Sequence, residues 1–193
     1  MANEKYDGKY LRCDIVAVKD AGVGGRLFSA TIDEEVPNGV IGTLGATLGS
    51  EGLPEVRELI LGVSNSDDMV IVMKPEINPD EYLKSNGALG LHRNRGFKPV
   101  PVIRLQNRDR IALSEDYFKN GIPKVGDELV VNNEGLMIKV TGSGADYKFV
   151  VTEIRNDKIP ALLYGEDEAR RRPIHKMITL ELVKVKAGSA MPA

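Results

Sequence analysis

The sequence predicts a mainly β protein: short antiparallel strands in a barrel-like or sandwich-like domain, a few short helices and an extended N-terminal arm. Three observations indicate this class. Apolar residues make up 42% of the 193 residues, are mostly aliphatic and include no Trp. The 20 Gly and 10 Pro place turn residues at short intervals. The apolar residues occur in short runs between these turns, which is typical of strands and not of a helical bundle.

The first expected strands lie in the N-terminal third of the chain. An apolar run covers residues 11–18, and the glycine cluster at 22–25 is expected to form a turn. Two further runs cover 27–32 and 40–44, and Asn38-Gly39 between them predicts a hairpin, because both residues tolerate a positive φ. Val56–Leu61 is expected to form the next strand.

The middle of the chain predicts two strands and a short helix. Residues 69–73 are apolar on both alternating faces, as in a central strand that is covered on both sides. Residues 78–83 predict a short helix with Asn78 as its cap. Residues 100–105 predict a strand, and its Pro101 restricts that strand to an edge or a bulge.

Residues 110–151 predict a strand, a helical turn and a meander. The strand covers 110–113, and the helical turn that follows is expected to be capped by Ser114. Three antiparallel strands are then expected at 128–131, at 136–140 and around Tyr147, Phe149 and Val151, which share one face.

The last predicted strand covers residues 176–186. Ile178, Leu180 and Leu182 alternate with polar residues, but Val183 continues the apolar pattern on the other face. A bulge or bend is therefore expected between Leu182 and Val183. We expect residues 1–25 to form the arm and first strand, 26–155 the main β-rich domain, and 156–193 a charged loop and a strand that returns to that domain.

Charge and cysteine content exclude several classes of protein. The formal net charge is 26 − 28 = −2, which argues against a nucleic-acid binder. A single cysteine, Cys13, and two histidines do not suit a disulfide scaffold or a zinc site. No apolar run approaches the length of a membrane span, and we expect the protein to remain in a reducing cytoplasm.

No residue pattern points to catalysis. The sequence Gly22-Val23-Gly24-Gly25-Arg26 lacks the ending of a phosphate-binding loop. His92 and His175 have no nucleophile signature nearby, and Cys13 lies in an apolar run that favours a buried, unreactive thiol. We therefore expect no catalytic residue, no cofactor and no metal.

Two basic clusters are the main candidates for binding a partner. The first includes Arg93 and Arg95, and the second includes Arg170, Arg171 and Arg172. Arginines can make bidentate contacts with carboxylates of another protein. Acidic residues precede the second cluster and aromatic residues are not interleaved with it, so a protein interface is favoured over nucleic acid.

Several short peptides occur in a recognisable order between residues 37 and 154. They are PNGVIGTLG at 37–45, PEI at 75–77, DEY at 80–82, VIRL at 102–105, PKVGDELVV at 123–131 and KFVVTEI at 148–154. This order resembles the head decoration, or cement, proteins of tailed bacteriophages. The first 25 residues and residues 156–176 have no counterpart in that family.

The resemblance implies a structural protein without catalytic activity. It would bind the outer surface of an expanded shell of major capsid protein and stabilise that shell against the pressure of packaged DNA. It would be found on the virion, and in the host cytoplasm during assembly, without contacting nucleic acid or a membrane. Self-association on the capsid, as a dimer or trimer, is expected. The residues expected to bind the partner are Tyr6, Tyr10, Arg12, Arg93, Arg95, Arg170, Arg171 and Arg172.

Two alternatives stay open at this point. One is a small ligand-binding or enzymatic β-barrel with the Gly126-Asp127 meander as one wall of a pocket. The other is a nucleic-acid-binding β-barrel that uses residues 170–172.

Overall fold

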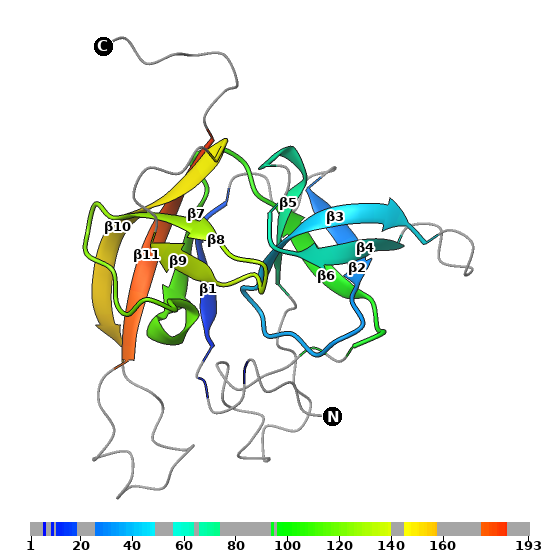
Figure 1. Ribbon diagram of the computed structural model, residues 1–193, viewed down its shortest axis with the longest axis horizontal. Helices are drawn as coiled ribbons and strands as arrows, with labels where there is room; N and C mark the ends of the chain where they lie inside the picture. Colours follow the sequence, from blue (N-terminus) through cyan, green and yellow to red (C-terminus); the bar gives the residue numbers. More distant parts are fainter. Residues whose placement is uncertain are drawn as a thin grey trace, which may run out of the picture.

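The computed structural model is a closed barrel beside a second, six-stranded sheet (Figure 1). It describes residues 6, 9, 11–18, 26–48, 56–63, 66–73, 94, 96–139, 145–157 and 175–184, with only the backbone at 138, 139, 157 and 175. The mainly β prediction is confirmed, and the buried side chains of both sheets form one continuous core.

The barrel has the strand order β2-β4-β3-β5-β6, and β6 closes on β2. Its pairs are antiparallel except β2 with β4. The strand predicted at 56–61 is confirmed, and all four residues of β5 are buried. The barrel strands are β2 (Leu27–Thr31), β3 (Ile41–Thr47), β4 (Val56–Leu61), β5 (Met69–Val72) and β6 (Val100–Arg104).

The hairpin predicted at Asn38-Gly39 is wrong, because β2 pairs with β4 and β6 and not with β3. The segment before β3 instead bonds to other parts of the chain. The Gly39 N–H donates to the Val72 carbonyl at 2.8 Å, and Val36 bridges to Asn94. Gly39 has φ of +89°, and a Cβ there would lie 2.6 Å from the Cβ of Cys13. Gly39 therefore allows the segment before β3 to pass close to Cys13 of the second sheet.

The prediction that Pro101 marks an edge or a bulge is also wrong, because β6 is paired on both sides and its ladders show no register shift. Pro101 lies one position beyond the last pair of β5 and β6, which is Val72 with Val102. Its carbonyl faces β5 and accepts a hydrogen bond from the Met73 N–H at 3.1 Å. The Pro101 nitrogen, which carries no N–H, therefore faces the end of β5, and neither ladder loses a hydrogen bond.

The second sheet is antiparallel, in the order β1-β7-β11-β10-β8-β9. β1 lies at one edge, and β11 lies between β7 and β10. Residues near both ends of the chain thus join the same sheet as the middle segment. Its strands are β1 (Cys13–Ala17), β7 (Arg110–Ser114), β8 (Glu128–Val131), β9 (Met137–Lys139), β10 (Tyr147–Asp157) and β11 (His175–Lys184).

The predicted meander is wrong in its strand order. The hairpin of β8 and β9 is confirmed, but β10 pairs with the other side of β8. The outer side of β9 is already occupied, since Phe118 bridges to Met137 and the Lys119 N–H donates to the Met137 carbonyl at 3.2 Å. Tyr147, Phe149 and Val151 are buried on one face, as predicted.

The bulge predicted between Leu182 and Val183 is wrong, because β10 and β11 pair in regular steps there. The register shift lies in β10, where Thr152 is an extra residue between two paired positions. Ile178, Leu180 and Leu182 are fully buried and Val183 is half-buried. The buried face of β11 therefore continues without a switch, and β10 is the strand that changes face.

The described helical segments are single 3-10 turns, η2 (Ser66–Asp68) and η4 (Glu115–Tyr117). Ser114 does not cap η4 through its side chain; its Oγ accepts a hydrogen bond from the Arg12 N–H at 2.9 Å and so ties β1 to β7. The helix predicted at 78–83 and the glycine cluster at 22–25 lie outside the described residues.

A buried ion pair fixes the barrel to the second sheet. Arg26, directly before β2, pairs with Asp109, directly before β7, and each side chain is only 5% exposed. The Arg26 guanidinium also donates to the Arg104 carbonyl at 3.0 and 3.1 Å. The Asp109 carbonyl accepts the Leu182 N–H at 2.9 Å. The connector between β6 and β7, residues 105–109, is thus bonded to both sheets.

We predict that Asp109→Ala destabilises the protein by about 3–5 kcal/mol, because it leaves a buried guanidinium without its carboxylate. Glu181→Ala is the matched control, since it removes the carboxylate from the surface pair of Glu181 with Arg110, which lies 2.8 Å away. That variant should lose at most about 1 kcal/mol. Urea unfolding measures both, and equal losses would contradict the role given to the buried pair.

Candidate functional site

Two of the predicted partner-binding residues, Tyr6 and Arg12, belong to the described part of the chain. The others, Tyr10, Arg93, Arg95, Arg170, Arg171 and Arg172, lie outside the described residues, as does His92. The site is therefore built from Arg12 and its surroundings.

Tyr6 packs in the protein's own core. Its side chain is 1% exposed, and its hydroxyl donates to the Glu134 carbonyl at 3.0 Å. Glu134 belongs to the loop between β8 and β9. Tyr6 is therefore bonded to this hairpin and offers no accessible surface to a neighbouring subunit.

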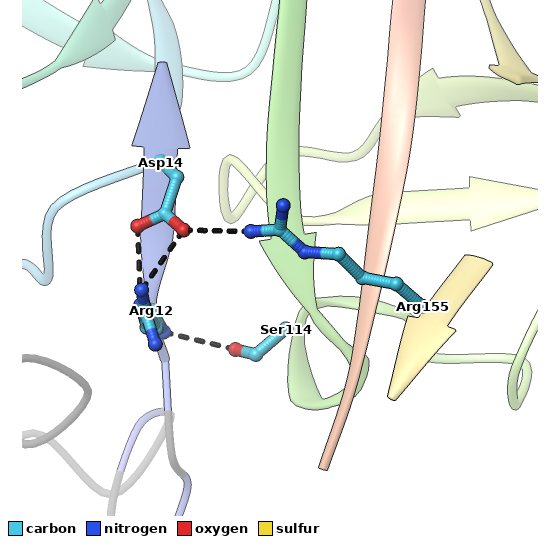
Figure 2. Close-up of polar contacts among 4 residues, drawn as sticks. All are labelled: Arg12, Asp14, Ser114 and Arg155. Carbon is cyan, nitrogen blue, oxygen red and sulfur yellow. Dashed lines mark hydrogen bonds and ion pairs between the residues drawn. The ribbon is translucent and has the colours of Figure 1, made fainter. Parts of the chain in front are cut away.

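Arg12 belongs to a cluster of charged residues that also contains Asp14 and Arg155. The Arg12 guanidinium donates from Nε to Asp14 Oδ1 at 3.1 Å and from Nη2 to Asp14 Oδ2 at 3.0 Å. Arg155 Nη2 donates to Asp14 Oδ2 at 3.1 Å. Figure 2 shows the two guanidinium groups approaching the carboxylate from different sides. We call these three residues the arginine cluster.

The sheet register explains why these side chains meet. Arg12 directly precedes β1 and Asp14 lies in it, two residues further along the extended chain, so the two side chains point to the same face. On this face, Asp14 is opposite Ala112 of β7, and Arg155 is opposite Met177 of β11. Ala112 and Met177 are buried, and the Arg155 side chain crosses β11 and β7 in Figure 2. Small residues on β7 leave room for this long side chain.

The arginine cluster has an excess of positive charge. Two guanidinium groups share one carboxylate, so its formal charge is +1. The side chain of Arg155 is 45% exposed, whereas those of Arg12 and Asp14 are 23% and 26% exposed. A guanidinium presents five N–H donors in a planar fork that fits a carboxylate. The exposed part of Arg155 is therefore suited to bind an acidic group of a partner.

Arg155 was missed from the sequence because strand periodicity gives the wrong face for it. Counted in steps of two from Tyr147, Phe149 and Val151, residue 155 would face the core. The extra residue Thr152 reverses that alternation, so Ile154 is half-buried and Arg155 lies on the outer face. The run Val150-Val151-Thr152 gives no signal of the bulge.

The described residues also contain further acidic groups and one cysteine, Cys13. No group of His, Cys, Asp and Glu in these residues is arranged to hold a metal ion. Asp127, suggested above as part of a pocket wall, accepts the Lys124 N–H at 2.8 Å and so shapes its own turn. No helix within the described ranges is long and apolar enough to cross a membrane.

Comparisons with family models, curated proteins and solved structures found no match to this chain.

Cys13 tests the expectation of an unreactive thiol. Cys13 is half-buried and not fully buried as expected. Desolvation by the surrounding protein, and to a smaller extent the neighbouring Asp14 carboxylate, raises the pKa of the Cys13 thiol well above its ordinary range. Because the thiolate is the nucleophile, iodoacetamide at about pH 8 should modify the native protein far more slowly than the urea-unfolded protein. Mass spectrometry over time measures both rates. Equal rates would show that the thiol is accessible and ionised in the native fold.

Proposed function

We propose that the protein is a phage capsid decoration protein that binds the outer surface of an expanded shell of major capsid protein. The sequence resemblance motivates this proposal. The structural observation that supports it is the arginine cluster, in which the exposed guanidinium of Arg155 shares the Asp14 carboxylate with Arg12 on a sheet face. A protein surface that carries carboxylates is the natural partner of such a group.

The rigidity of the site favours this function. Asp14 lies on β1, which is paired with β7, and Arg155 lies on β10, which is paired with β11. Arg12 directly precedes β1, and its N–H and carbonyl both bond to Ser114 at the end of β7. The cluster thus stands on hydrogen-bonded strands and not on a loop. A preformed site loses little conformational entropy on binding, so even a small contact contributes to attachment.

Several other cations on the surface are paired with carboxylates within the protein. Examples among the described residues are Lys119 with Glu134, Arg110 with Glu181 and Lys148 with Glu128. With a net charge of −2, these pairs favour one localised cationic contact over a broad basic surface. We therefore propose attachment to protein and not to DNA.

Stabilisation of the shell would follow from selective binding. A ligand that binds the expanded shell, but not its dissociated subunits, stabilises that shell by about RT ln(1 + [L]/Kd) at each site. Because a shell has many equivalent sites, small contributions add to a large total. No catalytic step is required.

The test is co-sedimentation of the purified protein with expanded and with unexpanded shells. We expect saturable binding to the expanded form only. Arg155→Ala should weaken binding about tenfold, which corresponds to roughly 1.4 kcal/mol and is typical of a lost hydrogen bond to a charged group.

Arg110→Ala is the matched control, since Arg110 is also an exposed arginine on a strand and pairs with Glu181. It should bind like the unchanged protein. Absence of binding to either shell would contradict the proposed function, whereas equal weakening by both substitutions would contradict the role of the arginine cluster alone.

A further inference from the structure

Two loops that contain no residue of the arginine cluster display large apolar side chains. Phe97 is 77% exposed and Val125 is 63% exposed, which makes them the most exposed large apolar residues in the described part of the chain. Phe97 precedes β6 of the barrel, and Val125 precedes β8 of the second sheet. Exposed apolar side chains that are held in place often mark interaction surfaces.

The backbone holds Phe97 outward. Its φ is +59°, which is unusual for a residue other than Gly, Asn or Asp. The Phe97 N–H donates to the Ile32 carbonyl at 2.8 Å. Gly96 lies so close to the backbone that a Cβ there would be 2.7 Å from the Asp33 carbonyl oxygen. This loop is fixed on the end of β2, and an unfavourable conformation at an exposed position suggests function.

A groove opens beside Phe97, with a volume of about 600 Å³. Its lining combines apolar residues, of which Val56 and Leu59 are buried, with acidic residues, of which Asp33 and Glu58 are exposed. We call the apolar residues its floor and the acidic residues, Asp33, Glu34 and Glu58, its rim. None of the described residues that line it is basic. We call it the Phe97 groove; its apolar lining residues are Ile32, Leu48, Val56, Leu59, Phe97 and Pro99.

The loop that carries Val125 is also rigid. The Lys124 N–H donates to the Asp127 carboxylate at 2.8 Å, and the Asp127 N–H donates to the Lys124 carbonyl at 3.0 Å. Gly126 and Asp127 are bonded to Val151 of β10 through backbone groups. Val125 therefore projects from a fixed turn, beside the exposed cation of Lys124. We call residues 122–126 the Val125 loop.

The Phe97 groove and the Val125 loop are complementary in chemistry. The groove offers an apolar floor with an acidic rim, and the loop offers an apolar side chain next to a lysine. They belong to the two sheets that lie side by side in Figure 1. Because one core and the Arg26–Asp109 pair hold these sheets together, a loop from another molecule is the natural occupant of the groove.

We propose that the Val125 loop of one copy docks in the Phe97 groove of a second copy. Val125 would pack on the apolar floor, and Lys124 would approach the carboxylate rim. Since the two surfaces differ, the contact is head-to-tail, and repetition of it produces rings or chains. The inference goes beyond the proposed function, since it requires no shell.

The contact is small, so association in solution should be weak. On a shell, however, neighbouring copies would be held at high local concentration, and weak contacts between them would add to the attachment.

Complementing variants test the proposal. Phe97→Asn removes the ring from the groove, and Asn tolerates the positive φ at this position. Val125→Asp places a negative charge opposite the acidic rim. Both positions are exposed, so both variants should fold, and an unchanged circular dichroism spectrum is the control. The measurement is sedimentation velocity at protein concentrations up to roughly 1 mM, where contacts of millimolar strength begin to form.

We expect the unchanged protein to associate with rising concentration and each variant alone to remain monomeric. An equimolar mixture should form a 1:1 heterodimer and nothing larger, because the intact groove of Val125→Asp accepts the intact loop of Phe97→Asn. A monomeric mixture would overturn the proposal. It is the result expected if the loop or the groove binds a different partner. Continued association of either variant alone would also overturn it.

A charge exchange provides a second test. Lys124→Glu and Glu58→Lys should each abolish association, and the double variant should restore it. Failure of the double variant to associate would contradict the predicted pairing. None of these outcomes depends on shell binding, so the proposed function and this inference can fail separately.

Discussion

The buried pair of Arg26 and Asp109 is the interaction on which the arrangement of the two sheets depends. Arg26 directly precedes β2 of the barrel and donates to the Arg104 carbonyl at the end of β6. Asp109 directly precedes β7 of the second sheet and accepts the Gln106 N–H of the connector between β6 and β7. A buried ion pair adds little stability compared with apolar packing, but its strict geometry specifies one arrangement. We infer that it fixes the relative positions of the Phe97 groove, the Val125 loop and the arginine cluster.

The sequence was sufficient to predict the strands and insufficient to predict how they pair. Strands at 56–61 and 128–131 were found from local pattern, since strand formation depends on neighbouring residues and turns. The Asn38-Gly39 hairpin and the meander were wrong because distant groups had already taken the relevant edges. The Gly39 N–H bonds to Val72, and the edge of β9 is covered by Phe118 and Lys119. Such competition is not visible in a local pattern.

The candidate site was predictable only in part, for the same reason. Arg12 was identified, but Arg155 required knowledge of the bulge at Thr152, which reverses the faces of β10. Tyr6 was assigned to a partner, yet its ring fills a space beside the loop between β8 and β9. The Arg26–Asp109 pair joins residues 83 positions apart. In an alternating pattern, a polar residue gives the same sequence signal whether its side chain faces solvent, a partner or a buried counterion.

The proposed function requires the protein to stabilise a shell as well as to bind it. Differential scanning calorimetry of expanded shells, titrated with the protein, tests this most directly. We expect the transition temperature of the shell to rise with added protein and to continue rising slowly after the sites are filled, as linkage requires. Saturable binding without any rise would contradict the claim, because a ligand that leaves the transition unchanged binds the expanded shell and its disrupted products equally well.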